Sequence, residues 1–152
     1  LLVSEKLLTY REFGGENWAD STLRSWLNGE FYNTVFTVEE KSLIQQTELA
    51  NPDNAAYGTW GGLSTVDNVF ILSAGEVQDY FSGNKKTAEK TGHANALEGS
   101  SVSSLDKSGG WWLRSVGKKF NIDCIDTDGF YSEMVYSNEN FVRPCIRISC
   151  GG

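Results

Sequence analysis

The sequence has few prolines and a single histidine, and both shortages narrow what the chain can be. Only two prolines accompany sixteen glycines among 152 residues, a balance that favours many turns between short strands over a helical bundle. His93 has Thr, Gly and Asn nearby, so a serine or cysteine nucleophile for it would have to come from a distant segment. We expect His93 to be a surface residue and predict no catalytic constellation.

Cysteine is also scarce, with Cys124, Cys145 and Cys150 as the three examples. An odd number without a C-x-x-C pair encodes neither a zinc site nor a disulfide framework. Cys124 and Cys145 could form a disulfide if they lie on adjacent strands of an exported protein. In a reducing compartment both would instead be small buried apolar groups. Apart from Arg147, no neighbouring residue would lower a thiol pKa, so a redox pair of Cys145 and Cys150 lacks support.

Basic residues are fewer than acidic ones, and long apolar runs are absent. Thirteen Lys and Arg against twenty Asp and Glu give a formal charge of −7, which repels phosphate backbones and anionic headgroups, so we expect no nucleic-acid partner. Lys85, Lys86 and Lys90 form the one basic cluster, which we interpret as a solvated stretch. No apolar run approaches the roughly 20 residues of a membrane span.

Aromatic residues are abundant and indicate a folded domain. Five Trp, six Tyr and eight Phe within 39% apolar residues exclude a disordered chain. The length fits one domain, residues 1–152, which on folding buries roughly 70% of the surface of the unfolded chain. Because Leu1-Leu2-Val3 reads as the middle of a strand, we expect this domain to be excised from a longer protein.

A first helix is predicted after Asp20 or Ser21, either of which can cap its first turn. Its apolar side chains recur at helical spacing and indicate a face packed on the core. They are Leu23, Trp26, Leu27 and Phe31.

Two capping boxes predict further helices. Thr37 and Glu40 have the spacing at which each side chain bonds the other residue's free amide, and the helix should cover about residues 38–46. Ser73 and Glu76 repeat the pattern before a third helix.

The C-terminal part predicts short strands joined by turns. Asp128 and Gly129 separate two of these strands, and Asp-Gly is a strong hairpin signal because both turn residues must tolerate positive φ. We therefore predict an α+β fold with two to three N-terminal helices and a C-terminal antiparallel sheet. The predicted strands are residues 1–4, 69–72, 111–114, 121–125, 131–136 and 142–148.

Two long stretches have no clear periodicity. Residues 51–65 predict an irregular connection, where Trp60 either pins the loop to the core or contacts a ligand. Residues 84–110 are polar and predict a loop with one helical turn around residues 87–97.

Charged residues in the C-terminal part are interpreted as structural. Asp123, Asp126 and Asp128 do not match a calcium loop, so we assign them to a hairpin turn and a strand edge. Arg114 and Arg143 lie in apolar strands and should tie the sheet to loops, although an inward arginine can also anchor an anion. The glycine pairs are not followed by the pattern of a phosphate-binding helix, so they do not indicate a nucleotide-binding loop. We expect no cofactor and no metal.

Three runs taken together resemble one known family, the domain of unknown function 6273, found in bacterial and often gut Firmicute proteins. The match covers nearly the whole chain in order. The runs are STLRSWLN at 21–28, continuing through FY at 31–32 to Phe36 and EEK at 39–41, then DNVFILS at 67–73, and WWLRS at 111–115 with VRP at 142–144.

The resemblance implies a fold similar to C-type lectins, to formylglycine-generating enzymes and to the variable proteins of diversity-generating retroelements. By that analogy the exposed positions within residues 120–140 face a partner. The chain departs from the family pattern at Val116, where a proline is usual, and at Cys124 and Cys145, and it lacks the family's opening Trp-Arg strand. The Glu-Pro-Asn and Trp-Asn-Asp signatures of calcium-dependent sugar binding are absent, and Cys145 and Cys150 do not occupy the catalytic positions of the formylglycine-generating enzymes.

We therefore expect a non-catalytic recognition module of an exported or cell-surface bacterial protein. It would bind protein or glycan through its loops and C-terminal hairpins, since exposed aromatic side chains offer contact area at low entropic cost. An enzyme related to the formylglycine-generating group and a purely structural domain are the alternatives. The predicted ligand contacts are Trp60, Tyr131, Tyr136, Asn138 and Asn140.

Overall fold

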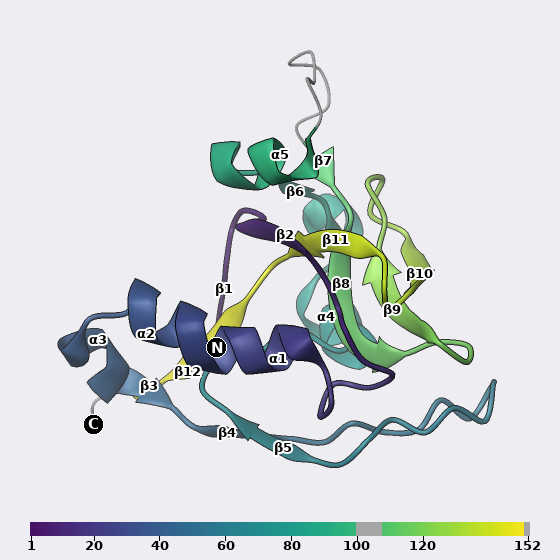
Figure 1. The fold of residues 1–152 in the computed structure, drawn as a ribbon, viewed down its shortest axis with the longest axis horizontal. Helices are drawn as coiled ribbons and strands as arrows, with labels where there is room; N and C mark the ends of the chain where they lie inside the picture. Colours follow the sequence, from purple (N-terminus) through teal and green to yellow (C-terminus); the bar gives the residue numbers. More distant parts are fainter. Residues whose placement is uncertain (100–107, 151–152) are drawn as a thin grey trace.

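The computed structural model describes residues 1–99 and 108–150, and both helices and strands are present (Figure 1), in agreement with the α+β prediction. Within these ranges the largest sheet has five strands in the order β10-β9-β8-β11-β2. These strands are β2 (Thr9–Glu12), β8 (Trp111–Val116), β9 (Asn121–Ile125), β10 (Tyr131–Val135) and β11 (Glu139–Val142).

The pairing in this sheet departs from the prediction at one junction. β10, β9 and β8 follow each other as antiparallel neighbours, and β11 is antiparallel to β2, but β11 runs parallel to β8, with Phe141 opposite Trp111. The prediction of a wholly antiparallel C-terminal sheet was therefore wrong. N-terminal β2 supplies the antiparallel neighbour on the far side of β11.

The predicted strand at residues 142–148 is two strands in different sheets. β11 ends at Val142, and β12 (Cys145–Ile148) begins after Pro144, which has no amide to continue a ladder. Among the described residues β12 lies between β1 (Leu2–Val3) and β3 (Ile44–Gln45) in a separate three-stranded sheet.

Ser21 caps the first helix as predicted, with its hydroxyl accepting from the amide of Arg24 at 3.1 Å. After α1 (Thr22–Trp26) the chain widens into a π-helix over Leu27–Phe31 before α2 (Tyr32–Val35), which spacing alone did not predict. Asn28 lies in this widened turn. Its side-chain amide donates to Val69 O at 2.8 Å, and its Oδ1 accepts from the amides of Asn68 and Val69.

Both predicted capping boxes are present, at Thr37 with Glu40 and at Ser73 with Glu76. α3 (Val38–Leu43) is shorter than predicted because Ile44 leaves the helix to pair with β12. α4 (Ala74–Tyr80) follows the second box.

Residues 69–72 are buried as predicted, but they do not form a strand. Phe70 makes one bridge to Cys145, and Leu72 O accepts from the amide of Arg114 at 3.0 Å. The segment passes from β12 to β8, so it has no single neighbouring strand with which to extend a ladder.

Residues 51–65 are largely irregular, as predicted, and extend from the two-stranded pair of β4 (Thr47–Leu49) with β5 (Thr65–Asp67). Figure 1 shows this segment, which we call the arm and define as residues 47–67, crossing below the rest of the fold. Residues 84–110 hold more structure than predicted, although residues 100–107 lie outside the described part. The elements there are a 3-10 helix at Gly83–Lys86, β6 (Ala88–Glu89), α5 (Gly92–Glu98) and β7 (Ser108–Gly109).

Arg114 and Arg143 both bond to neighbouring segments, as expected, although Arg143 lies between β11 and β12 and not in a strand. Arg114 Nη2 donates to Glu76 Oε1 at 3.0 Å, which ties β8 to the start of α4. Arg143 has no carboxylate partner among the described residues, and instead lies against the Phe81 and Trp111 rings with its Nε donating to Ser4 O.

A buried carboxylate joins the arm to the first helix. Asp67 is 1% exposed and accepts hydrogen bonds from Trp18 Nε1 at 2.9 Å, Arg24 Nε at 2.7 Å and Thr65 Oγ1 at 2.7 Å. A carboxylate in this position is stabilised only because all three donors are present.

Asp67→Asn should lower the free energy of unfolding by about 2–3 kcal/mol. The neutral amide would leave the charge of Arg24 without an ionised partner, and its NH2 group could not accept a hydrogen bond from Trp18 or Thr65. Urea unfolding of both forms measures this. Glu48→Gln on neighbouring β4, where the side chain is exposed, is the control and should change stability by less than about 0.5 kcal/mol. Equal stability of Asp67→Asn and the parent would contradict the role given to Asp67.

Candidate functional site

A hollow of about 480 Å³ opens where the arm, α4 and the β9–β10 hairpin meet. We call it the acidic hollow. It is lined by Tyr57 of the arm, by Ala74, Gly75 and Gln78 of α4, and by Asp123, Tyr131, Ser132 and Glu133 of the hairpin.

The hairpin register places two carboxylates in this hollow. Asp123 on β9 is directly opposite Glu133 on β10, so their side chains point to the same face of the sheet. A Cβ atom on Gly117 would overlap Glu133 Oε2 and lie 3.1 Å from Asp123 Oδ1. Both oxygens therefore occupy space that is open because residue 117 is glycine.

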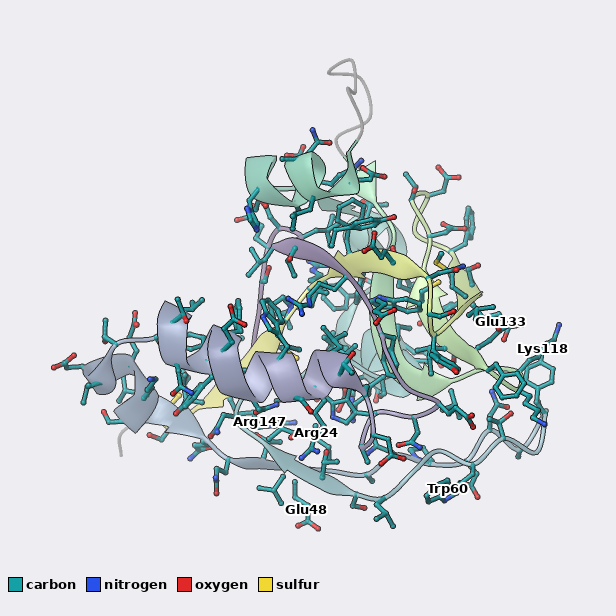
Figure 2. The ribbon with its side chains drawn as sticks, viewed as in Figure 1. Arg24, Glu48, Trp60, Lys118, Glu133 and Arg147 are labelled. Carbon is teal, nitrogen blue, oxygen red and sulfur yellow. The ribbon has the colours of Figure 1, made fainter. Side chains whose placement is uncertain are left out.

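Glu133 is held by the turn between β8 and β9. Its Oε2 accepts from the Lys118 amide at 2.8 Å, and its Oε1 lies 3.5 Å from Lys118 Nζ. Figure 2 shows Lys118 and Glu133 together beside the tip of the arm. The arm is fixed there as well, since Asn54 Nδ2 donates to Val116 O at 2.9 Å and Lys118 Nζ lies 5.4 Å from the centre of the Tyr57 ring.

Asp123 differs electrostatically from Glu133. Burial of its carboxyl group, together with the nearby charge of Glu133, raises the pKa of Asp123 from 3.8 to about 6. No ion pair or hydrogen bond joins the Asp123 side chain to a described residue. Its oxygens are therefore available to a donor from outside the protein.

Tyr131 forms another wall of the hollow. Its hydroxyl lies 3.5 Å from Ala74 O, and Lys86 Nζ lies 4.7 Å from the centre of its ring. Burial, with a smaller contribution from Asp79, raises the pKa of this phenol. Tyr131 is therefore a neutral donor and an aromatic surface at neutral pH, and it is still 47% exposed.

A family model described as a domain of unknown function (DUF6273) matches residues 1–150. The chain belongs to the DUF6273 family. No curated protein and no solved structure matches it.

The runs that carried the DUF6273 resemblance bond to one another at several points. Asn28 of the first run binds Val69 of the second, and Arg114 of the third run donates to Ile71 O and from its amide to Leu72 O. None of the residues in these runs lines the acidic hollow. In this DUF6273 domain the runs hold the scaffold, and the hollow is built from residues outside them.

Of the predicted ligand contacts, Tyr131 alone lines the acidic hollow. Trp60 is 57% exposed on the arm, so it does not pin that loop to the core, and Figure 2 shows it projecting away from the fold. Tyr136 packs against Phe120, and the Asn138 amide donates to Val135 O in a turn. Asn140 is only 6% exposed and lies opposite Arg11 in the ladder between β11 and β2.

The prediction missed Tyr57, Gln78, Asp123 and Glu133 as residues of the site. One signal in the sequence could have found two of them. A hairpin centred on Asp128 and Gly129 sets Asp123 opposite Glu133, which would have placed two acidic side chains on one face.

The hairpin turn lies where it was predicted, but its backbone geometry differs from the prediction. Gly129 has φ of +87°, whereas Asp128 is not in the positive region. Asp126 Oδ1 organises the turn by accepting from the amides of Asp128 and Phe130 at 2.9 Å each. Asp126 and Asp128 therefore have the turn role expected of them, and Asp123 has a different role in the hollow. Within the described residues no group of three or more Asp, Glu, His or Cys side chains could hold a metal.

The cysteines do not form a pair. Cys124 is buried on β9 and Cys145 is buried on β12, in different sheets, so the condition for a disulfide between adjacent strands is not met. Burial raises the pKa of Cys124 to about 11 and raises that of Cys145 as well. Both thiols are neutral at physiological pH, and Cys150 is exposed and free.

His93 is exposed, as expected. Across residues 1–99 and 108–150, none of the helices has the length and apolar character that crossing a membrane requires.

Asp123→Asn should stabilise the fold at pH 7 by about 1 kcal/mol, an amount reduced because solvent screens this half-buried group. The pKa of Asp123 is about 6 in the folded state and near 3.8 when unfolded, so the cost of its ionisation grows as the pH rises from about 3.8 and is complete above about 6. Below pH 3.8 the carboxyl is mostly protonated in both states, and most of the gain should disappear. Thermal unfolding at pH 7 and pH 3.5 measures the difference.

The matched control is Asp128→Asn, an exposed residue of the same hairpin, which should be close to the parent at both pH values. A gain for Asp123→Asn that is the same at both pH values would show that the charge of Asp123 is not its cause.

Proposed function

We propose that this DUF6273 domain is a non-catalytic recognition module that binds a protein or glycan ligand in the acidic hollow. The observation that carries the proposal is the hollow itself, which is lined by two partly exposed tyrosines and by polar side chains from three separate elements. Concave sites that combine aromatic surface with a few polar groups are typical of ligand binding.

The site is arranged before any ligand arrives. Glu133 is held by Lys118, and the tip of the arm is held to β8 by Asn54. Tyr57 is 54% exposed and Tyr131 is 47% exposed, so both can contact a ligand while few rotatable bonds have to be fixed. Gln78 and Asp123 add hydrogen-bonding groups to the lining of the hollow.

The proposal includes a location on an exported or cell-surface bacterial protein and a fold similar to C-type lectins. The fold rests on what the DUF6273 resemblance implies, and the location is proposed together with the recognition function. The helices α1 to α3 precede the C-terminal strands in the chain, as the resemblance leads us to expect of such a fold. The hollow also lies against the β9–β10 hairpin, within the residues 120–140 where the resemblance puts a partner-facing surface.

Two alternative functions have less support. An enzyme related to the formylglycine-generating group would need reactive cysteines, and Cys145 is buried with its Sγ donating to Phe70 O at 3.2 Å. A purely structural domain would be expected to bury its aromatic residues and to have no cleft, whereas Tyr57, Trp60 and Tyr131 are exposed.

Tyr131→Ala and Gln78→Ala should each weaken ligand binding by about tenfold or more, because each removes a wall of the hollow. Purified domain applied to glycan and peptide arrays identifies ligands, and calorimetry with the best ligand measures the loss. Tyr136→Ala is the control, since that ring packs on Phe120 outside the hollow. Binding that Tyr131→Ala leaves unchanged, or no binding on either array, would contradict the proposal.

A further inference from the structure

β10 forms one edge of the five-stranded sheet and β2 forms the other. The β2 edge is covered, since α5 lies over it in Figure 1 and the Thr91 amide donates to Leu7 O just before β2. β10 has no such cover among the described residues, and Figure 1 shows it at the outer side of the sheet. Strand edges of this kind can accept a further strand.

The backbone pairing shows which groups of β10 are free. The Asp126 amide donates to Phe130 O at 2.8 Å and the Tyr136 amide donates to Phe120 O at 3.0 Å. Hydrogen-bonded pairs alternate along an antiparallel ladder, so Tyr131, Glu133 and Val135 direct their amide and carbonyl groups away from β9. Within residues 1–99 and 108–150, the one backbone bond to these groups is from Asn138 N to Val135 O.

This edge lies between two hollows. Ser132 lines the acidic hollow on one face of β10 and also lines a second hollow of about 290 Å³. Met134 also lines the second hollow, and its side chain points to the face opposite that of Glu133. An added strand would therefore have a hollow available on each face of the sheet.

Both hollows carry excess negative charge. Asp123 and Glu133 line the first, and Glu98, Asp126 and Glu139 line the second together with one cation, Lys90. Lys90 is paired with Glu98 at 2.8 Å, and Lys118 is paired with Glu133. Asp123 has no cationic partner among the described residues.

We propose that β10 binds an extended basic peptide as a further strand of the sheet, with consecutive peptide side chains entering the two hollows. The inference rests on the proposed recognition function and names its ligand. Backbone hydrogen bonds from Tyr131, Glu133 and Val135 supply affinity without regard to sequence, and the hollows select side chains. Because consecutive residues of a strand point to opposite faces, two adjacent Lys or Arg residues satisfy both hollows.

The test uses the capped peptide Thr-Val-Lys-Arg-Val-Thr and fluorescence anisotropy. Val135→Pro removes one outward amide and places a ring on the edge, while the bonds from β10 to β9 remain. It should weaken binding at least tenfold, and the control Val135→Thr should stay within twofold. Every second amide of the bound peptide would donate to β10, and the others would point away from it. N-methylation of the first set should weaken binding to the unaltered domain, whereas N-methylation of the second set should not. This second measurement holds even if Val135→Pro fails to fold.

The outcomes separate this inference from the proposed function. If an array ligand is lost with Tyr131→Ala but not with Val135→Pro, the hollow binds a ligand, such as a glycan, and strand addition is wrong. If the basic peptide does not bind, or an acidic peptide of equal length binds as well, the inference is overturned. Dimerisation of the domain that Val135→Pro abolishes would instead make a second copy the occupant of the edge.

Discussion

The register of the β9–β10 hairpin is the constraint on which the candidate site depends. It sets Asp123 opposite Glu133, and Gly117 leaves the space in which their carboxylates approach. Two acidic groups so close cannot both ionise without cost. Lys118 offsets the charge of Glu133, while burial raises the pKa of Asp123 to about 6. A shift of one residue in the register would send one carboxylate to the other face and remove the site.

The scaffold that fixes this hairpin is assembled from segments far apart in the chain. Asp67 joins the arm to α1, Asn28 joins the π-helix to Val69, and Arg114 joins β8 to α4. These bonds hold the arm and α4 as two walls of the hollow. The residues that carry the family resemblance therefore act on the site indirectly, by positioning the elements that line it.

Sequence patterns correctly predicted the structural features that are decided by residues close together in the chain. Both capping boxes and the Ser21 cap were correct because their partners are three residues apart. The patterns did not predict the parallel pairing of β11 with β8, the break of one expected strand at Pro144, or the early end of α3 at Ile44. Each of these is decided by a partner strand that is distant in sequence. The hollow was missed for the same reason, since Tyr57, Gln78 and Glu133 meet only after folding.

Amide chemical-shift mapping of the 15N-labelled domain tests the central claim most directly. A ligand selected on the arrays is titrated into the labelled protein and the shifted amides are located on the structure. We predict that the largest shifts fall on Gln78, Asp123 and residues 131–135, with Asn138 and the exposed Trp60 little affected. Shifts confined to the arm around Trp60, or spread over the surface without a centre at the hollow, would contradict this account.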